Sequence, residues 1–405
     1  MNELLYKMQL VGYQNRDYFA IVAKPTTGSA TPTARLKRLR VMTWCLVVLG
    51  LGLPWLCLAR TVAAANCLMT PWEAANKRRY LRRAVRTLQR RPDLIVIGIT
   101  GSYGKTSVKN ILDAMLSTQY RVVSSPASFN TPQGLARTVN EHLRADTEVL
   151  IMEMGARHVG DIREMCDLCH PRHGIITSIG ECHLATFGDV ATVAATKAEL
   201  FAALPVDGLA VTDGDNPWCR ELKHPRLTLV HRGDEHFATP LLGEHNQTNI
   251  ALAAAVAREL GINETNLKTA VANLTPTDHR LQTITAPNGI VILDDSYNAN
   301  PVSAASALGV LATYATRKVV QTPGFVEQGA NAATAHAHLC EQIKATADAV
   351  IVVGDVNREY FVRGLAGWGQ PVYYVPTRDA AKNWYPSLLK AGDVLLLLND
   401  LPENY

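Results

Sequence analysis

A glycine-rich loop between an apolar strand and a helix is the feature that most constrains this fold. The apolar residues 94–99 lead into TGSYGKTS at 100–107, and the helical segment VKNILDAML follows. Glycines let backbone amides approach phosphate oxygens, and the helix presents the positive end of its dipole. A lysine adds charge and the next threonine can bind Mg²⁺. The order predicts a nucleotide phosphate site on an α/β fold, although Ile99 replaces the first glycine of the strict pattern.

The predicted contacts of this loop to a nucleotide are its glycines, its hydroxyl groups and its lysine. They are Gly101, Ser102, Tyr103, Gly104, Lys105, Thr106 and Ser107, with Lys105 also expected to act in catalysis.

Two series of strand-like segments alternate with helical stretches. The first series is at 94–99, 149–154 and 173–179, and the second begins after residue 280 with GIVILDD. Such alternation predicts parallel sheets with crossover helices. We expect an α/β architecture with four parts: an unassigned segment 1–34, an apolar and basic helical region 35–92, a nucleotide-binding central domain 93–280, and a smaller Rossmann-like domain 281–405.

Charge is distributed unevenly along the chain. The formal net charge is +4, but residues 35–91 hold 13 Lys and Arg against one acid, Glu73, which leaves 27 basic and 35 acidic residues elsewhere. A strongly basic region joined to a mildly acidic body is typical of binding to a membrane surface or a nucleic acid.

Within the basic region lies an apolar run at 41–59, about the length of a bilayer-spanning helix. Basic residues flank both ends, so the positive-inside rule selects no orientation for a single span. Gly50, Gly52 and Pro54 would allow a re-entrant or interfacial hairpin, and a buried core helix is the alternative. We predict attachment to the cytoplasmic membrane through residues 41–68, followed by a basic amphipathic helix at 71–91.

The segment from Cys166 to His173 has the residues of a zinc half-site or a haem attachment motif. No second CxxC pair or suitably spaced histidine pair completes a zinc site. We therefore interpret Cys166 and Cys169 as reduced thiols at helical spacing.

Polar residues follow the other strands of the first series. Glu153 ends a strand, where a carboxylate faces the ligand crevice of a parallel sheet and suits Mg²⁺. Asn130 and Thr131 follow an earlier strand, in a loop that alone would be an ordinary turn. His183 and Lys197 carry little information by themselves.

Polar residues also lie at the start of one helix and at the boundary between the two series of strands. His245, Asn246 and Asn249 begin a helix, where they could contact a nucleotide or cap the helix. Arg280 lies between the two series. Polar residues also follow the first strand of the second series, as an interdomain site requires: Asp295, Tyr297 and Asn298.

Six of these motifs, in order over residues 94–400, resemble the Mur ligase superfamily, and among its members the group that adds D-alanyl-D-alanine. They are TGSYGKTSVK, the glutamate segment at Glu153, HLATFG, TKAEL, GEHNQTN and DDSYNANP. The resemblance implies Mg²⁺ ligands at Thr106, Glu153, His183 and Lys197, the last as a carbamate. It also implies nucleotide contacts at His245, Asn246, Asn249, Asp295, Tyr297 and Asn298, substrate contacts at Asn130 and Thr131, and an Arg280 that reaches phosphate on domain closure.

The resemblance implies a reaction as well. ATP and Mg²⁺ would activate a carboxylate as an acyl phosphate, and an amine would then displace phosphate. The expected partners are a small-molecule or lipid-linked cell-wall precursor and an amine acceptor, with a membrane surface and no nucleic acid. The catalytic domains are expected in the cytoplasm. The alternatives are a ligase for another acidic substrate, as in folylpolyglutamate or cyanophycin synthetases, or a membrane-tethered nucleotide-binding scaffold without turnover.

Two departures from the family pattern concern the substrates. Residues 1–92 lack the α/β pattern of a UDP-binding domain, and the segments TPGFVEQG and VLLLLNDLPENY replace the usual substrate-side motifs. We hypothesise that the apolar and basic region holds the enzyme at a membrane where its substrate is lipid-linked.

Overall fold

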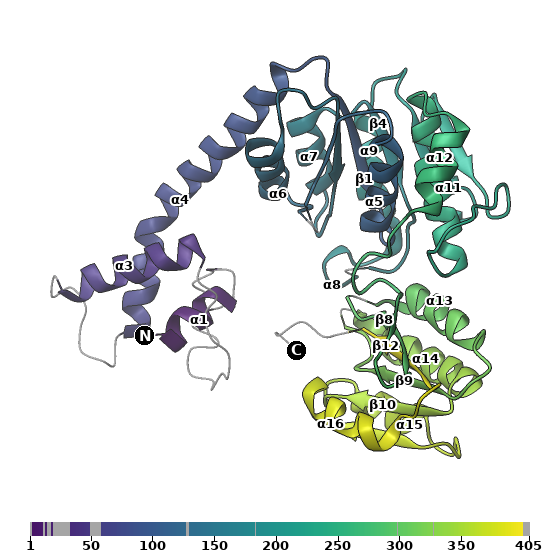
Figure 1. Cartoon of the computed structure of the whole chain (residues 1–405). Helices are drawn as coiled ribbons and strands as arrows, with labels where there is room; N and C mark the ends of the chain where they lie inside the picture. Colours follow the sequence, from purple (N-terminus) through teal and green to yellow (C-terminus); the bar gives the residue numbers. More distant parts are fainter. Residues whose placement is uncertain are drawn as a thin grey trace. The chain divides into compact units, whose positions relative to one another are not determined.

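The computed structural model describes residues 2–10, 13, 18, 33–48, 58–126, 129–182, 184–297, 299–326 and 328–399. The chain forms two compact units, Met1–Arg83 and Ala84–Glu403. The second unit contains two six-stranded sheets (Figure 1). The sequence predicts a further domain boundary near residue 280, inside the second unit. The four predicted domain ranges stay a prediction.

The described part of the N-terminal unit is helical. It contains α1 (Asn2–Leu10), α3 (Ala34–Val48) and most of α4 (Leu58–Gln89), which includes Pro71 and continues into the second unit. These helices bury a small apolar core of Leu5, Met8, Leu36, Leu39, Val62, Ala65 and Met69.

The apolar run at 41–59 is divided between two helices. Its first part ends α3 at Val48, and α4 begins at Leu58. Residues 49–57, with the predicted hairpin positions Gly50, Gly52 and Pro54, lie outside the described residues. Among the residues that are described, no helix has both the length and the apolar character needed to cross a membrane.

The first sheet is entirely parallel, with strand order β2-β3-β1-β4-β5-β6. Its strands are β1 (Ile95–Thr100), β2 (Val122–Ser124), β3 (Val149–Glu153), β4 (His173–Ile176), β5 (Ala210–Asp213) and β6 (Leu227–Val230). All carboxyl ends therefore lie at one edge, where ligands of open α/β sheets bind.

Helices cover both faces of this sheet. Ile97 and Ile99 pack in one core with residues of α5 (Lys105–Leu116), α11 (Glu244–Glu259) and α12 (Glu264–Ala272). The alternate residue Gly98 faces Leu200 of α9 (Val190–Ala203), which packs with α7 (Asp161–Cys169) on the other side. Shorter helices are α6 (Pro132–Arg137), the π-helical turn η2 (Thr138–His142), α8 (Leu184–Phe187) and α10 (Pro217–Arg220).

The second sheet has the order β11-β10-β9-β12-β8-β7, with β7 antiparallel to β8 and the other neighbours parallel. Its strands are β7 (Gln282–Thr285), β8 (Val291–Asp295), β9 (Lys318–Thr322), β10 (Ala349–Val353), β11 (Val372–Val375) and β12 (Val394–Leu398). The last strand of the chain thus lies inside the sheet.

Helices also cover both faces of the second sheet. One core contains residues of α13 (Pro301–Ala312), α14 (Ala332–Thr346) and α15 (Arg358–Gly364), and the other contains residues of α16 (Arg378–Leu388). A 3₁₀ turn, η3 (Gly329–Asn331), precedes α14. The predicted α/β fold, with a parallel first sheet and a second α/β sheet after it, is confirmed.

The cysteine segment forms ordinary helix and strand structure. Cys166 and Cys169 are buried on α7, and burial raises the pKa of the Cys166 thiol to about 12. His173 lies in β4, where its Nδ1 accepts a hydrogen bond from the Leu209 amide at 3.0 Å. Within the described ranges, no group of three or more His, Cys, Asp or Glu residues could hold a metal ion.

Candidate active site

The phosphate loop needs glycine at two positions. Gly101 has φ 152°, and a Cβ there would lie 1.9 Å from the Thr177 hydroxyl oxygen. Gly104, at the start of α5, has φ 77°, and a Cβ would lie 2.8 Å from Asn249 Oδ1. Backbone in this region favours glycine, and here space excludes a side chain as well. The loop is therefore packed between the end of β4 and the start of α11.

Side chains of the loop bind the segment after β4. Ser102 Oγ donates to the Gly180 carbonyl at 3.1 Å, and the Tyr103 hydroxyl donates to the Glu181 carbonyl. Thr177 Oγ1 donates in turn to the Tyr103 carbonyl. These bonds fix the loop before any ligand arrives.

Lys105 begins α5 and bends over the loop. Its Nζ donates to the Gly101 carbonyl at 2.7 Å and the Ser102 carbonyl at 3.3 Å. Burial lowers the pKa of Lys105, while the nearby Glu153 carboxylate acts in the opposite direction. The ammonium group is held at the place where a helix start attracts phosphate.

Glu153, at the carboxyl end of β3, is the centre of a buried polar cluster. Thr106 Oγ1 donates to Glu153 Oε2 at 2.9 Å, and Asn130 Nδ2 donates to Oε1 at 3.1 Å. The Glu153 amide donates to Ser125 Oγ at 3.1 Å. Three residues predicted from the sequence, Thr106, Asn130 and Glu153, are thus brought into contact.

Lys109 is a member of this cluster that sequence reasoning missed. Its Nζ lies 3.5 Å from Glu153 Oε2 and donates to the Ser125 carbonyl at 2.7 Å, and both side chains of the ion pair are at most 2% exposed. Burial lowers the pKa of Lys109 and Glu153 opposes this shift. The available signal was its position one helical turn after Lys105.

Lys197 is buried on α9 and is only 3% exposed. Burial, and secondly the charge of Lys105, lower the pKa of Lys197 to about 8. No carboxylate lies within ion-pair distance of its Nζ among the described residues, which do not include His183. The predicted metal contact at His183 therefore lies outside the described residues.

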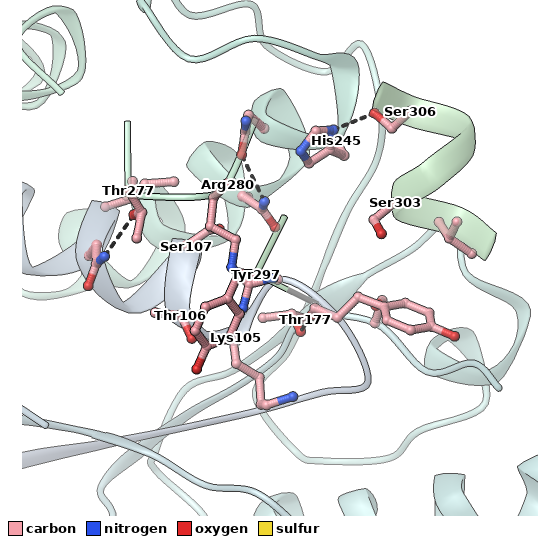
Figure 2. A pocket seen from close by; sticks show the side chains of 18 of the residues that line it. Lys105, Thr106, Ser107, Thr177, His245, Thr277, Arg280, Tyr297, Ser303 and Ser306 are labelled. Atoms are coloured by element: carbon pink, nitrogen blue, oxygen red, sulfur yellow. Dashed lines mark hydrogen bonds between the residues drawn. The ribbon is translucent and has the colours of Figure 1, made fainter. Parts of the chain in front are cut away.

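Polar residues at the start of α11 face the phosphate loop and the second sheet. Asn249 Nδ2 donates to Asn246 Oδ1 at 3.1 Å, and Asn249 approaches Gly104 as described above. His245 Nδ1 lies 2.6 Å from the Ser306 hydroxyl oxygen of α13 (Figure 2). Residues far apart in sequence thus meet at this helix start.

Arg280 lies in the linker before the second sheet. Its guanidinium lies 4.3 Å from the centre of the Tyr297 ring, and burial lowers its pKa. Burial raises the pKa of Asp295 to about 6, against the attraction of Arg280. His279 and Leu281 on either side of Arg280 have φ 59° and 50°, which is unfavourable for residues with a Cβ. Asn298 lies outside the described residues.

Most of these groups, but neither Lys109 nor Lys197, line one cavity of about 1050 Å³. Its wall includes Ser102, Lys105 and Thr106 from the first sheet's loop and helix, and Tyr297, Ser303 and Ser306 from the second (Figure 2). The other predicted residues in the wall are Tyr103, Gly104, Ser107, Asn130, Glu153, His245, Asn246, Asn249, Arg280 and Asp295.

Three described residues that were predicted to belong to the site do not line the cavity. Gly101, Thr131 and Lys197 are not among the described wall residues, and Thr131 Oγ1 instead accepts the Gly134 amide at 3.2 Å and caps α6. Sequence reasoning missed several polar wall residues: Arg157, Asp213, Arg232, Ser303, Ser306 and Gln328.

Comparison with known proteins identifies related domains in both halves of the second unit. Residues 99–231 match the Mur ligase middle domain, and residues 279–399 match the glutamate ligase domain of Mur ligases. A UDP-N-acetylmuramoyl-tripeptide--D-alanyl-D-alanine ligase of Mycobacterium tuberculosis is 34% identical over 357 residues, which cover 75% of this chain and 70% of the relative.

Solved structures share the fold. The MurF ligase of Thermotoga maritima in complex with ADP superposes with a TM-score of 0.70 at 23% identity, over 80% of each chain. The folylpolyglutamate synthase of Mycobacterium tuberculosis in complex with ADP gives 0.62 at 17% identity, over 80% of this chain and 91% of that one. Likeness at this identity concerns the fold alone. The two domain matches and the 34% identical relative show that this chain belongs to the Mur ligase family, and that it is MurF-like.

Proposed function

We propose that this chain is an ATP-dependent amide ligase that extends the peptide of a cell-wall precursor. The observation that carries the proposal is the single cavity on which the phosphate loop, the Glu153 cluster and Arg280 converge. The relatives are named as ligases that join D-alanyl-D-alanine to a UDP-N-acetylmuramoyl-tripeptide, and this pair is the first substrate pair to test.

ATP fits the cavity through its phosphates. The loop amides and the start of α5 would bind phosphate oxygens, and Lys105 would exchange a carbonyl partner for one of them. His245, Asn246 and Asn249 are available for the nucleoside, since they lie in the same wall.

Mg²⁺ suits the oxygen groups of the Glu153 cluster. The Thr106 hydroxyl and the Glu153 carboxylate meet at 2.9 Å beside the loop, and both are the hard ligands that Mg²⁺ prefers. In the proposed site Thr106 and Glu153 would hold the ion, which would neutralise phosphate charge. Further ligands are proposed at His183 and at a carbamate on Lys197, for which the amine's lowered pKa provides the neutral form.

The residues of the cavity support transfer by positioning and charge rather than by a nucleophilic side chain. A substrate carboxylate would attack the γ-phosphorus of ATP, ADP would leave, and an amine would displace inorganic phosphate from the acyl phosphate. Lys105 and Arg280 would offset the negative charge of the transferred group. The second sheet's residues would close the cavity against water.

The acyl and amine substrates are the open part of the proposal. Val326 and Gln328 line the cavity in the segment TPGFVEQG, which departs from the family pattern. This observation supports a second candidate, a ligase for another acidic substrate. The presence of Lys105, Glu153 and Lys197 argues against a scaffold without turnover.

An assay of ADP and phosphate release separates these candidates. The intact protein is incubated with ATP, Mg²⁺ and pairs drawn from UDP-muramoyl tripeptide, other acidic acyl substrates, amino acids and D-alanyl-D-alanine, and products are identified by mass spectrometry. We expect ADP release that requires both an acyl substrate and an amine, and that is lost in Lys105→Met. ATP hydrolysis independent of every pair, or none at all, would contradict a ligase.

We also propose that the precursor is presented at a membrane, in lipid-linked form. The support is the excess of basic residues at 35–91. The intact protein should then have a higher kcat/KM for a lipid-linked muropeptide in vesicles than for its UDP-linked equivalent. Equal values, or a preference for the UDP-linked form, would contradict this part of the proposal.

A further inference from the structure

An exposed apolar face runs along α3. Val41, Trp44 and Val47 are 62%, 53% and 36% exposed, and their spacing of three residues places them on one side of the helix. At 100° per residue, Val41 and Trp44 lie across the helix from Leu39, which is buried in the core of the N-terminal unit, whereas Val47 lies above the buried Leu36 at the end of the helix. A helix that is apolar on both sides has a second surface to cover.

The helix α4 also carries both exposed and buried apolar residues. Leu68 and Trp72 are 61% and 52% exposed and lie one turn apart, while Val62, Ala65 and Met69 are buried in the same core. Arg38 of α3 lies 5.1 Å from the centre of the Trp72 ring and bonds both carboxylate oxygens of Glu73. The contact brings α3 beside the exposed part of α4.

Exposed arginines follow Leu68 and Trp72 along α4. Arg78, Arg79 and Arg82 are exposed, and at 100° per residue Arg79 and Arg82 lie on the side of Leu68 and Trp72. No carboxylate pairs with these three arginines among the described residues. The one acid of residues 35–91, Glu73, is already bonded to Arg38.

The connection between α3 and α4 is also apolar. Its nine residues, 49–57, lie outside the described residues, and their sequence, LGLGLPWLC, contains no charged residue. The exposed apolar residues of α3 lie in the turns that lead into this connection.

We propose that Val41, Trp44, Val47, Leu68 and Trp72, with Arg79 and Arg82, form a lipid-binding face that lies in the interface of an anionic bilayer. Tryptophan favours the headgroup boundary, aliphatic side chains enter the acyl region, and arginine attracts anionic headgroups. A nucleic acid would satisfy the arginines but would leave Val41 and Leu68 without a partner. The inference deepens the membrane part of the proposed function and rests on it, but not on the ligase chemistry.

The test is binding of the intact protein to vesicles of phosphatidylcholine, with or without phosphatidylglycerol, measured by flotation. Two double variants remove the two components of the face: Trp44→Ser with Trp72→Ser, and Arg79→Glu with Arg82→Glu. Matched controls on the second unit are Trp384→Ser, an exposed tryptophan, and Arg220→Glu with Lys223→Glu, an exposed basic pair.

We expect binding to the anionic vesicles only, weakened by salt. Reversal of the two arginines should weaken it at least about 30-fold, because each basic group near an anionic surface contributes roughly a factor of five. The tryptophan variant should also lose binding, and both controls should retain it. ADP release in solution should be unchanged in all four variants.

Three results would overturn the lipid-binding face. They are no vesicle binding by the intact protein, equal losses in the matched controls, or displacement from vesicles by a short RNA or DNA that binds more tightly. Vesicle binding without ligase activity would reject the ligase alone and leave the face standing.

Discussion

Lys109 and Glu153 form an ion pair whose two side chains are at most 2% exposed. Lys109→Met should lower the free energy of unfolding by about 3 kcal/mol, because a buried charge that loses its partner is strongly destabilising. Urea denaturation at pH 7 measures the change. The double variant Lys109→Met with Glu153→Gln should be less destabilised than the sum of the single variants, and simple additivity would show that the pair is uncoupled.

Lys197 makes stability depend on pH in a defined direction. Its pKa is about 8 in the folded protein and about 10.5 as an ordinary lysine, so the unfolded chain binds the proton more tightly. The free energy of unfolding should therefore rise between about pH 8 and 10.5 and receive no such contribution below pH 8. Urea denaturation in CO₂-free buffer should show a flatter profile for Lys197→Met. The exposed Lys223→Met is the control, and a profile unchanged in Lys197→Met would be inconsistent with the burial of a neutral amine.

At the residue scale, sequence reasoning found the groups whose positions a parallel sheet dictates. Glu153 ends a strand and Thr106 follows the loop lysine, so topology brings both to one edge. Lys109 was missed because its burial depends on Ser125 and Glu153, which only tertiary packing supplies. Thr131 shows the opposite error, since its hydroxyl caps a helix, a role that competes with ligand contact for the same residue type.

At the scale of elements, three helices in the first half of the second unit, α5, α7 and α11, begin after a glycine with positive φ, and the first two provide a matched comparison. Gly104→Ala should weaken ATP binding at least tenfold, because a Cβ would meet Asn249 Oδ1 and shift the loop. Gly160→Ala at the start of α7 has φ 90° but no atom within 4 Å of the added Cβ. Each variant should lose about 1 kcal/mol of stability from strain, but only the first should change the affinity measured by calorimetry. Equal affinities would mean that the loop tolerates the side chain.

The parallel order of the first sheet followed from its strand and helix alternation, but the helical N-terminal unit was less predictable. The sequence at 41–59 is compatible with a span, a hairpin or a core helix, and the described structure divides it between α3 and α4. Periodicity cannot distinguish a helix buried on one face from one with apolar residues on both. Trp44 and Trp72 show the difference only through their exposure.

At the scale of the whole molecule, one cavity is shared by both sheets of the second unit. A non-hydrolysable ATP analogue with Mg²⁺ should therefore slow amide hydrogen exchange at 101–107 and also at 300–306, near Ser303 and Ser306. Exchange in α16 should not change, since its residues pack on the other face of the second sheet. Protection at 101–107 alone would show that the nucleotide binds without the second sheet.

The position of β12 has a consequence for how the protein is made. This final strand, Val394–Leu398, pairs with both β8 and β9 in the middle of its sheet. The central domain can fold while the ribosome is still translating, but the second sheet stays divided until its last segment leaves the exit tunnel. Ser303 and Ser306 then reach the cavity only after β12 has been synthesised. A nascent chain should accordingly bind nucleotide before it can turn it over, because turnover requires β12 to have joined the second sheet.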